Sequence, residues 1–424
     1  MLGERAHSRL LGEGGVTTLH GLCAYVRRSG FRWIVPRFLI MLVVVSIVAV
    51  MLVRPSLSAQ RRREVRSTST ECDTVMAYVL LPQSLVPVEF SAATGKGAVV
   101  APGKVNQAIP VPNGASALAL TADGRTAYVA GSDGLTPINL VTRKAGPTIP
   151  LSGGGSALAL TPDGRTAYVA GSDGVTPINL VTRKAGPTIV LPGANDIVVD
   201  GDGKTAFVTT SNSVNRLSLR EERVDYRLSL DNQSLTRQGS PYAIAPYAIA
   251  LTPDGTTAFV TMGASGLVER IDLTTMTVVY PNNPIMLTQE AYSIVIAPNG
   301  GVAYVASGLD YVSGASPYLK GNPVGTIGSF AVETNSGSPP QQSGVGSVGG
   351  PLAVSADSSY IYATGVSDGA ATIDVLKSTG ALVGFPTHLG DKAPPRALVL
   401  HAGKCSGPRT TLIRQPDVAD DQVA

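Results

Sequence analysis

Tryptophan, histidine and cysteine are scarce in this chain of 424 residues, which contains one Trp, four His and three Cys. Only His388 and His401 lie beyond residue 66, and their separation does not match the ligand spacing of a zinc site. The chain also lacks a Gly-x-Ser-x-Gly sequence and a P-loop. These absences give little support to a histidine-based zinc centre, and they exclude the nucleophile elbow of α/β-hydrolases and the phosphate loop of NTPases.

Charged residues make up only 15% of the chain, and they are divided unevenly along it. Residues 1–66 contain 11 Arg and 3 Glu, a net charge of +8. Residues 67–424 contain the remaining 22 basic and 27 acidic residues, a net charge of −5. This larger part lacks the basic balance of nucleic-acid-binding proteins, so no nucleic acid partner is expected.

One apolar run, Phe38 to Val53, has sixteen residues without a charge. As a helix it spans about 24 Å, and counting back to Trp33, with Arg37 snorkelling, gives a full span of the ~30 Å hydrocarbon core. A retained signal anchor and a cleaved signal peptide both fit, the latter with a cut near Ser56-Leu57-Ser58. Arginines flank both sides of the run, so the positive-inside rule does not settle its orientation.

Internal repeats dominate the rest of the chain. Residues 116–149 recur as residues 156–189 with only two differences, Ala122/Pro162 and Leu135/Val175. Weaker copies share an Ala/aromatic/Val strand after a polar turn such as TPDG, and Asp-Gly suits tight hairpin turns. The seven aromatics of these copies are Tyr78, Tyr128, Tyr168, Phe207, Phe259, Tyr304 and Tyr362.

One unit can be divided into four short strands: Ala157–Thr161, Thr166–Ala170, Val175–Val181 and Pro187–Leu191. Four antiparallel strands in about forty residues are typical of one β-propeller blade. Because a blade cannot bury both of its faces alone, the units are expected to close into a ring. The sequence therefore predicts an all-β fold, a seven-bladed β-propeller behind one N-terminal transmembrane or signal-anchor helix.

Two incomplete units predict how the ring closes. The first aromatic strand, Ala77–Leu81, has no inner strand before it, and Ala397–His401 has no aromatic strand after it. Together they complete one blade. On the template of the other units, Cys72 and Cys405 both fall at the open turn of this blade, which predicts a disulfide between them and an oxidising compartment.

The repeats TAYVAGSDGVTPINLVTRKAGPTI and AIALTPDGTTAFVT resemble the bacterial YVTN-repeat (YncE-like) propellers. Residues 328–383 also resemble the lactonase-type seven-bladed propellers. The resemblance implies an extracytoplasmic protein. Some relatives of these families are lactone hydrolases, but no catalytic motif of the lactone hydrolases is visible in this sequence. The single Trp lies outside the repeats, which excludes Trp-Asp repeats and tryptophan-rich quinoprotein blades.

The expected organisation has five parts: a cytoplasmic segment (1–37), a membrane helix (38–53), a linker (54–75), the propeller (76–402) and a C-terminal tail (403–424). The propeller is expected at the cell membrane on the extracytoplasmic side, or secreted if the signal is cleaved. The membrane would be contacted through the N-terminal helix.

The default binding site of a propeller is the mouth of its central channel. The position just before each innermost strand recurs seven times, as Ser116, Ser156, Asn195, Tyr247, Tyr292, Gly350 and Arg396, and Asp196 and Glu290 lie beside this ring. The mixture of aromatic, amide, basic and acidic groups favours a binding module for a small polar ligand or an envelope protein. The alternative is a lactonase-type hydrolase that uses the carboxylates. No cofactor or metal is predicted, although Asp196 or Glu290 could hold a divalent cation such as calcium.

Overall fold

The computed structural model describes residues 65–69, 74–93, 98–112, 114–230, 245–263, 265–279, 285–286, 291–307, 326–333, 337–338, 350–367, 369–402 and 409–413. These residues form strands and turns, and no helix found among them could cross a bilayer. The predicted membrane helix 38–53 lies outside the described residues, as do Cys72, Glu290 and Cys405.

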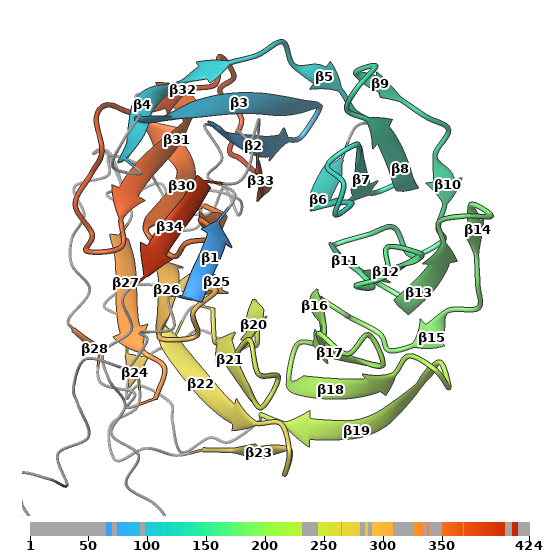
Figure 1. Cartoon of the computed structure of the whole chain (residues 1–424). Coiled ribbons are helices and arrows are strands. Elements are labelled where there is room, and N and C mark those ends of the chain that lie inside the picture. Colours follow the sequence, from blue (N-terminus) through green and yellow to red (C-terminus); the bar gives the residue numbers. More distant parts are fainter. Residues whose placement is uncertain are drawn as a thin grey trace, which may run out of the picture. The chain divides into compact units, whose positions relative to one another are not determined.

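The chain forms a seven-bladed propeller in which each blade is one antiparallel sheet (Figure 1). We number the blades by the chain order of their innermost strands. Blade 1 contains β6 (Ala115–Leu120), β7 (Thr126–Gly131), β8 (Gly134–Asn139), β9 (Lys144–Ala145) and β10 (Ile149–Pro150). Blade 2 contains β11 (Ala157–Leu160), β12 (Thr166–Gly171), β13 (Gly174–Asn179), β14 (Lys184–Ala185) and β15 (Ile189–Val190). Blade 3 contains β16 (Asp196–Val199), β17 (Thr205–Thr209), β18 (Ser213–Ser218) and β19 (Arg223–Ser229).

The remaining blades complete the ring. Blade 4 contains β20 (Ile249–Leu251), β21 (Thr257–Thr261), β22 (Leu267–Asp272), β23 (Thr277–Val278) and β24 (Ile285–Met286). Blade 5 contains β25 (Ala291–Ile296), β26 (Val302–Ser307), β27 (Thr326–Ala331) and β28 (Gly337–Ser338). Blade 6 contains β29 (Leu352–Val354), β30 (Tyr360–Ser367), β31 (Ala370–Lys377) and β32 (Thr387–His388).

Blade 7 joins the two ends of the chain, as the incomplete repeats predicted. It contains β33 (Ala397–Ala402), β2 (Thr74–Leu81), β3 (Ser84–Ala93), β4 (Ala98–Val105) and β5 (Ile109–Pro110). The innermost strand β33 pairs with β2 in a register that places Val75 opposite Ala402 and Leu80 opposite Ala397. A separate two-stranded sheet pairs β1 (Val65–Ser69) with β34 (Arg409–Ile413).

Seven hydrophobic clusters hold the blades together, one at each interface between neighbours. Alternation along each strand sends successive side chains to opposite blades. In β7, for example, Ala127 and Val129 pack towards blade 7, whereas Ala130 packs towards blade 2. The innermost strands contact one another in a closed ring that runs from β6 round to β33 and back to β6.

The repeated TPDG turn joins the two innermost strands of a blade. In blade 2, Asp163 accepts hydrogen bonds from the Thr161 hydroxyl at 2.6 Å and the Arg165 amide at 3.0 Å. The hydrogen bond from the Thr161 hydroxyl is the main cause that lowers the pKa of Asp163. Gly164 adopts a φ of 66°, which an L-residue rarely accepts. The Asp of this motif therefore shapes a turn.

The outer part of each duplicated blade differs from the predicted strands. The third strand of blade 2 ends at Asn179 and not at Val181, and the fourth strand is split into β14 and β15. Both pieces pair with β13, one at each of its ends. Between them lies Pro187, which has no amide hydrogen to donate to a strand ladder. The fourth strand therefore begins at Lys184, earlier than the predicted start at Pro187.

Candidate functional site

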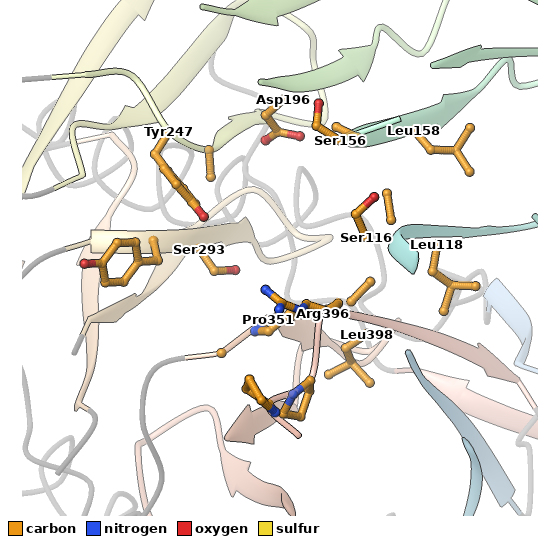
Figure 2. A pocket seen from close by; sticks show the side chains of 18 of the residues that line it. Ser116, Leu118, Ser156, Leu158, Asp196, Tyr247, Ser293, Pro351, Arg396 and Leu398 are labelled. Carbon is orange, nitrogen blue, oxygen red and sulfur yellow. The ribbon is translucent and has the colours of Figure 1, made fainter. Parts of the chain in front are cut away.

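All seven positions of the predicted ring line one pocket, of about 470 Å³, at the end of the propeller where the innermost strands begin (Figure 2). Because each position lies within two residues of the start of an innermost strand, the seven blades bring these seven residues to the same opening. Of the predicted site residues, the structure brings together Asn195, Asp196, Tyr247, Tyr292 and Arg396. Glu290 lies outside the described residues.

Side chains of the ring connect consecutive blades by hydrogen bonds to the backbone. Ser116 of blade 1 donates to the carbonyl of Gly155, the residue before Ser156. Ser156 of blade 2 donates to the carbonyl of Ala194 at 3.0 Å. Each hydroxyl also lies within hydrogen-bond distance of a carbonyl of its own blade, that of Ala130 at 3.2 Å or Ala170 at 3.1 Å. Both hydroxyl hydrogens are therefore engaged with the backbone, and these side chains offer a ligand mainly their oxygen lone pairs.

The same pattern continues from blade 3 into blades 4 and 5. The Asn195 amide donates to the carbonyls of Pro246 at 3.4 Å and Tyr247 at 3.2 Å. The Tyr247 ring meets the Tyr292 ring edge to face, with centroids 5.4 Å apart and an angle of 77° between the planes. Tyr247 remains 44% exposed, so this aromatic pair presents ring surface at the pocket.

Asp196 occupies a position where the other blades have small or apolar residues. Its equivalents are Ala117, Ala157, Ala248, Ser293, Pro351 and Ala397. The Asp196 carboxyl accepts a hydrogen bond from the Ile249 amide of blade 4 at 2.9 Å and one from the Ile197 amide at 2.9 Å. Burial raises the pKa of Asp196 to about 6, and the two amide bonds oppose that rise. The pKa of this carboxyl group thus lies well above the usual value of 3.8 for an aspartate.

Arg396 enters the pocket from blade 7, on the opposite side from Asp196 (Figure 2). Its backbone amide donates to the carbonyl of Leu80 at 2.7 Å, which fixes the start of β33. Its side chain is exposed, and the structure shows no ion pair between it and any described residue. Arg396 is the one basic residue among the described residues that line this pocket.

An apolar wall forms the part of the pocket that the sequence did not indicate. Leu118, Leu158 and Leu398 line it from blades 1, 2 and 7 (Figure 2). Each also packs in or against a hydrophobic cluster between two blades. The repeated Ala-Leu-Ala-Leu strands contain these residues, but their alternation predicts only core packing. The pocket therefore combines an apolar wall with an aromatic pair, one cation and one carboxyl group.

Metal binding has no visible support among the residues that the structure describes. Within them, no three His, Cys, Asp or Glu side chains lie close enough together to share an ion. A calcium site at Asp196 or Glu290 stays a prediction, and Glu290 lies outside the described residues. His401 lies against the turn of blade 1, where a Cβ placed on Gly124 would overlap its Nε2 atom.

Comparison with known proteins supports the fold and leaves the function open. No family model and no curated protein matches the sequence. Among solved structures, a 6-phosphogluconolactonase candidate from Bacteroides uniformis is similar, with a TM-score of 0.55, 14% identity, and coverage of 78% of this chain and 100% of that one. A protein of unknown function from Desulfotomaculum acetoxidans has a TM-score of 0.52, 16% identity, and coverage of 77% and 98%.

A third similar structure is the hydrazine synthase of Kuenenia stuttgartiensis, with a TM-score of 0.54, 17% identity, and coverage of 67% of this chain and 88% of that one. At these identities the likeness shows the propeller fold alone. The resemblance to YVTN-repeat propellers stays a prediction.

Proposed function

We propose that the protein is a binding module that holds a small anionic ligand in the mouth of its propeller. The observation that carries the proposal is the Arg396 guanidinium, which lines a pocket of about 470 Å³ without an ion pair to any described residue. A guanidinium pairs with carboxylate or phosphate through two parallel hydrogen bonds. A pocket of this volume falls within the ~300–1,000 Å³ of small-molecule sites.

The other lining residues suggest the rest of the ligand. The Tyr247–Tyr292 pair offers ring surface, and the partly exposed Leu158 adds some aliphatic surface. Asn195, Ser116 and Ser156 already bond to the backbone, so they add acceptors and few donors. An anion attached to a flat or apolar body fits this lining better than a bare ion does.

We further propose that the module works outside the cytoplasm, held to the membrane by residues 38–53. The apolar run and the two cysteines beyond it support this placement. A protein partner of the envelope is an alternative occupant of the same mouth, and it would use the same tyrosines and Arg396.

The test is binding of three probes by calorimetry: inorganic phosphate, gluconate and 4-hydroxybenzoate. We expect 4-hydroxybenzoate to bind most tightly, and Arg396→Ala to weaken that binding by about tenfold or more, since charged anchors dominate recognition. Arg396→Lys should restore part of the affinity. Arg125→Ala, an exposed arginine at the other end of the propeller, is the matched control. The proposal is wrong if none of the probes binds, or if Arg396→Ala and Arg125→Ala change the affinity for 4-hydroxybenzoate equally.

Lactone hydrolysis is the second candidate function. It is supported by the similar structure described as a 6-phosphogluconolactonase candidate and by a carboxyl group of pKa about 6 facing the pocket. In this reaction water attacks the lactone carbonyl, the ring C–O bond breaks, and the leaving oxygen gains a proton. Above pH 6 an ionised Asp196 could take the proton from water, and Arg396 could stabilise the oxyanion.

The two candidates give opposite results with gluconolactone. A binding module leaves the rate of lactone opening at the uncatalysed level. An enzyme accelerates it, and Asp196→Asn then removes the acceleration, while Arg125→Ala does not. Acceleration that survives Asp196→Asn would point instead to Glu290, which Glu290→Gln would test.

A further inference from the structure

Two neighbouring turns of blades 1 and 2 present the same exposed tip. Each tip has the sequence Val-Thr-Arg-Lys, at residues 141–144 and 181–184. Val141 is 72% exposed and Val181 is 74% exposed, in contrast to most valines of the described residues. All four residues of each tip are exposed.

The tips are held in shape by their own backbone. The Asn139 side chain accepts hydrogen bonds from the amides of Val141 at 3.0 Å and Thr142 at 2.8 Å, and Asn179 makes the same bonds in blade 2. Arg143 and Arg183 complete the turns with φ values of 56° and 57°. A fixed turn loses little conformational entropy when it binds a surface.

Each tip lies beside the TPDG-type turn of the same blade. The Leu140 amide donates to the Arg125 carbonyl at 2.9 Å, and the Leu180 amide donates to the Arg165 carbonyl at 2.8 Å. The four turns together contain six basic and two acidic residues, and we call them the basic turn patch: Arg125, Arg143, Lys144, Arg165, Arg183 and Lys184, with Asp123 and Asp163. Its net charge is +4.

The other described turns at this end of the propeller have the opposite charge. In blades 3 to 6 they contain eight acidic residues, Asp200, Asp202, Glu221, Glu222, Asp254, Asp272, Glu333 and Asp357. Their basic residues number four, Lys204, Arg220, Arg223 and Lys377. Their net charge is −4, so the positive charge is concentrated on the two duplicated blades.

The chain enters and leaves the propeller at the same end as the patch. β2 begins at Thr74, and Val75 pairs with Ala402 near the end of β33. The opposite end of this pair lies at the mouth, where the Arg396 amide bonds to Leu80. Blade 7 borders blade 1, so the N-terminal entry and the patch belong to neighbouring blades.

From these features we infer that the basic turn patch docks on an anionic lipid surface. The predicted membrane segment ends at Val53, and the twenty residues 54–73 can reach at most ~70 Å when extended. A membrane-bound chain therefore keeps the patch within reach of the bilayer. Basic residues are attracted to anionic headgroups, and the two valines can enter the boundary between headgroups and acyl chains.

This orientation directs the pocket away from the membrane. The pocket lies at the ends of the innermost strands opposite to the TPDG turns, so docking through the patch leaves Arg396 and the tyrosines open to ligand. The inference rests on the proposed membrane placement but not on what the pocket binds, so ligand binding and membrane docking can fail separately.

The test is hydrogen exchange of the full chain inserted in lipid nanodiscs, either zwitterionic phosphatidylcholine or a mixture with anionic phosphatidylglycerol. We expect peptides covering residues 141–145 and 181–185 to exchange at least about threefold more slowly in the anionic discs, with the protection lost at high salt. The equivalent turn of blade 3, residues 218–223, has an acidic centre and is the internal control.

A variant with Val141→Ser, Val181→Ser, Lys144→Ser and Lys184→Ser should lose the protection while keeping the exchange pattern of the blade cores. Equal exchange of the tips in the two lipids would overturn the inference. So would equal protection of residues 218–223, or protection that appears only when an acidic protein is added.

Discussion

The Asp196 carboxyl of blade 3 accepts a hydrogen bond from the Ile249 amide of blade 4, at 2.9 Å. It joins two blades at the pocket, through a group whose pKa burial raises to about 6. Because that pKa lies above the value of 3.8 for an unburied Asp, the folded protein holds this proton more tightly than the unfolded chain does. The contribution of Asp196 to stability is therefore greatest below pH 4, and it falls as the pH rises through 6.

Asp196→Asn should remove this pH dependence. The wild-type free energy of unfolding should fall between pH 4 and pH 7 by up to about 3 kcal/mol from this group, and the variant should lack that fall. Urea titrations at pH 4.5, 6 and 8 measure it. The Asp residues of the turns, such as Asp163 and Asp254, have lowered pKa values and act below pH 4, so they do not obscure the result. Parallel curves for the two proteins would contradict the prediction.

Tyr247 and Tyr292 should stabilise the contact between blades 4 and 5 as a pair. Their edge-to-face geometry predicts a coupling free energy of about 0.5–1.5 kcal/mol. The measurement is a double-mutant cycle of Tyr247→Leu and Tyr292→Leu by thermal or urea unfolding. Strictly additive effects of the two changes would show that the rings do not interact.

Gly124 and Gly164 offer a matched comparison in two nearly identical turns. Both have φ near 65°, so an alanine at either position is strained by about 1 kcal/mol. A Cβ on Gly124 would also meet His401, whereas a Cβ on Gly164 has nothing within 4 Å. Gly124→Ala should therefore destabilise the protein by roughly 1–3 kcal/mol more than Gly164→Ala.

The control for this comparison is His401→Ala. In that background, Gly124→Ala should cost no more than Gly164→Ala does in the wild type. If Gly124→Ala keeps its extra cost without the imidazole, the clash with His401 is not its cause.

The disulfide between Cys72 and Cys405 stays a prediction, since both residues lie outside the described part of the chain. Val75 and Ala402 are paired in the register of β2 and β33. Cys72 lies three residues before Val75 in the sequence, and Cys405 lies three residues after Ala402. The bridge would close a loop of more than three hundred residues, worth roughly 5 kcal/mol at most in the chain-entropy model. Mass spectrometry of the protein purified without reductant tests it, and two free thiols would disprove the bridge.

Much of the ring was predictable because the propeller repeats. A position that recurs in the strand of every unit lies at the same level along the channel axis in every blade. Ser116 and Arg396 could therefore be assigned to one opening from the spacing of the repeats alone. The closure of blade 7 followed from two strands, Ala77–Leu81 and Ala397–His401, that lacked partners.

The contents of the pocket were less predictable, since they depend on neighbours from other blades. Nothing in the repeat shows that Asp196 reaches the Ile249 amide, because that bond crosses an interface whose spacing is set by side-chain packing. Leu118 and Leu158 have the same pattern as any core leucine. The fourth strand is split around Pro187, a break that the alternation of the repeat does not indicate.

The serine bonds at the mouth have a consequence for how such a ring can grow. Ser116 and Ser156 each hold the residue that precedes the next ring position, and both lie at the start of the 34 residues that are nearly identical in the two blades. The copied segment thus contains a whole blade together with its own fastening to the blade that follows. Duplication of the DNA that encodes this segment adds a blade that already carries its hydrogen bond to the next blade. The number of blades can therefore change in a single recombination event, without new contacts having to evolve first.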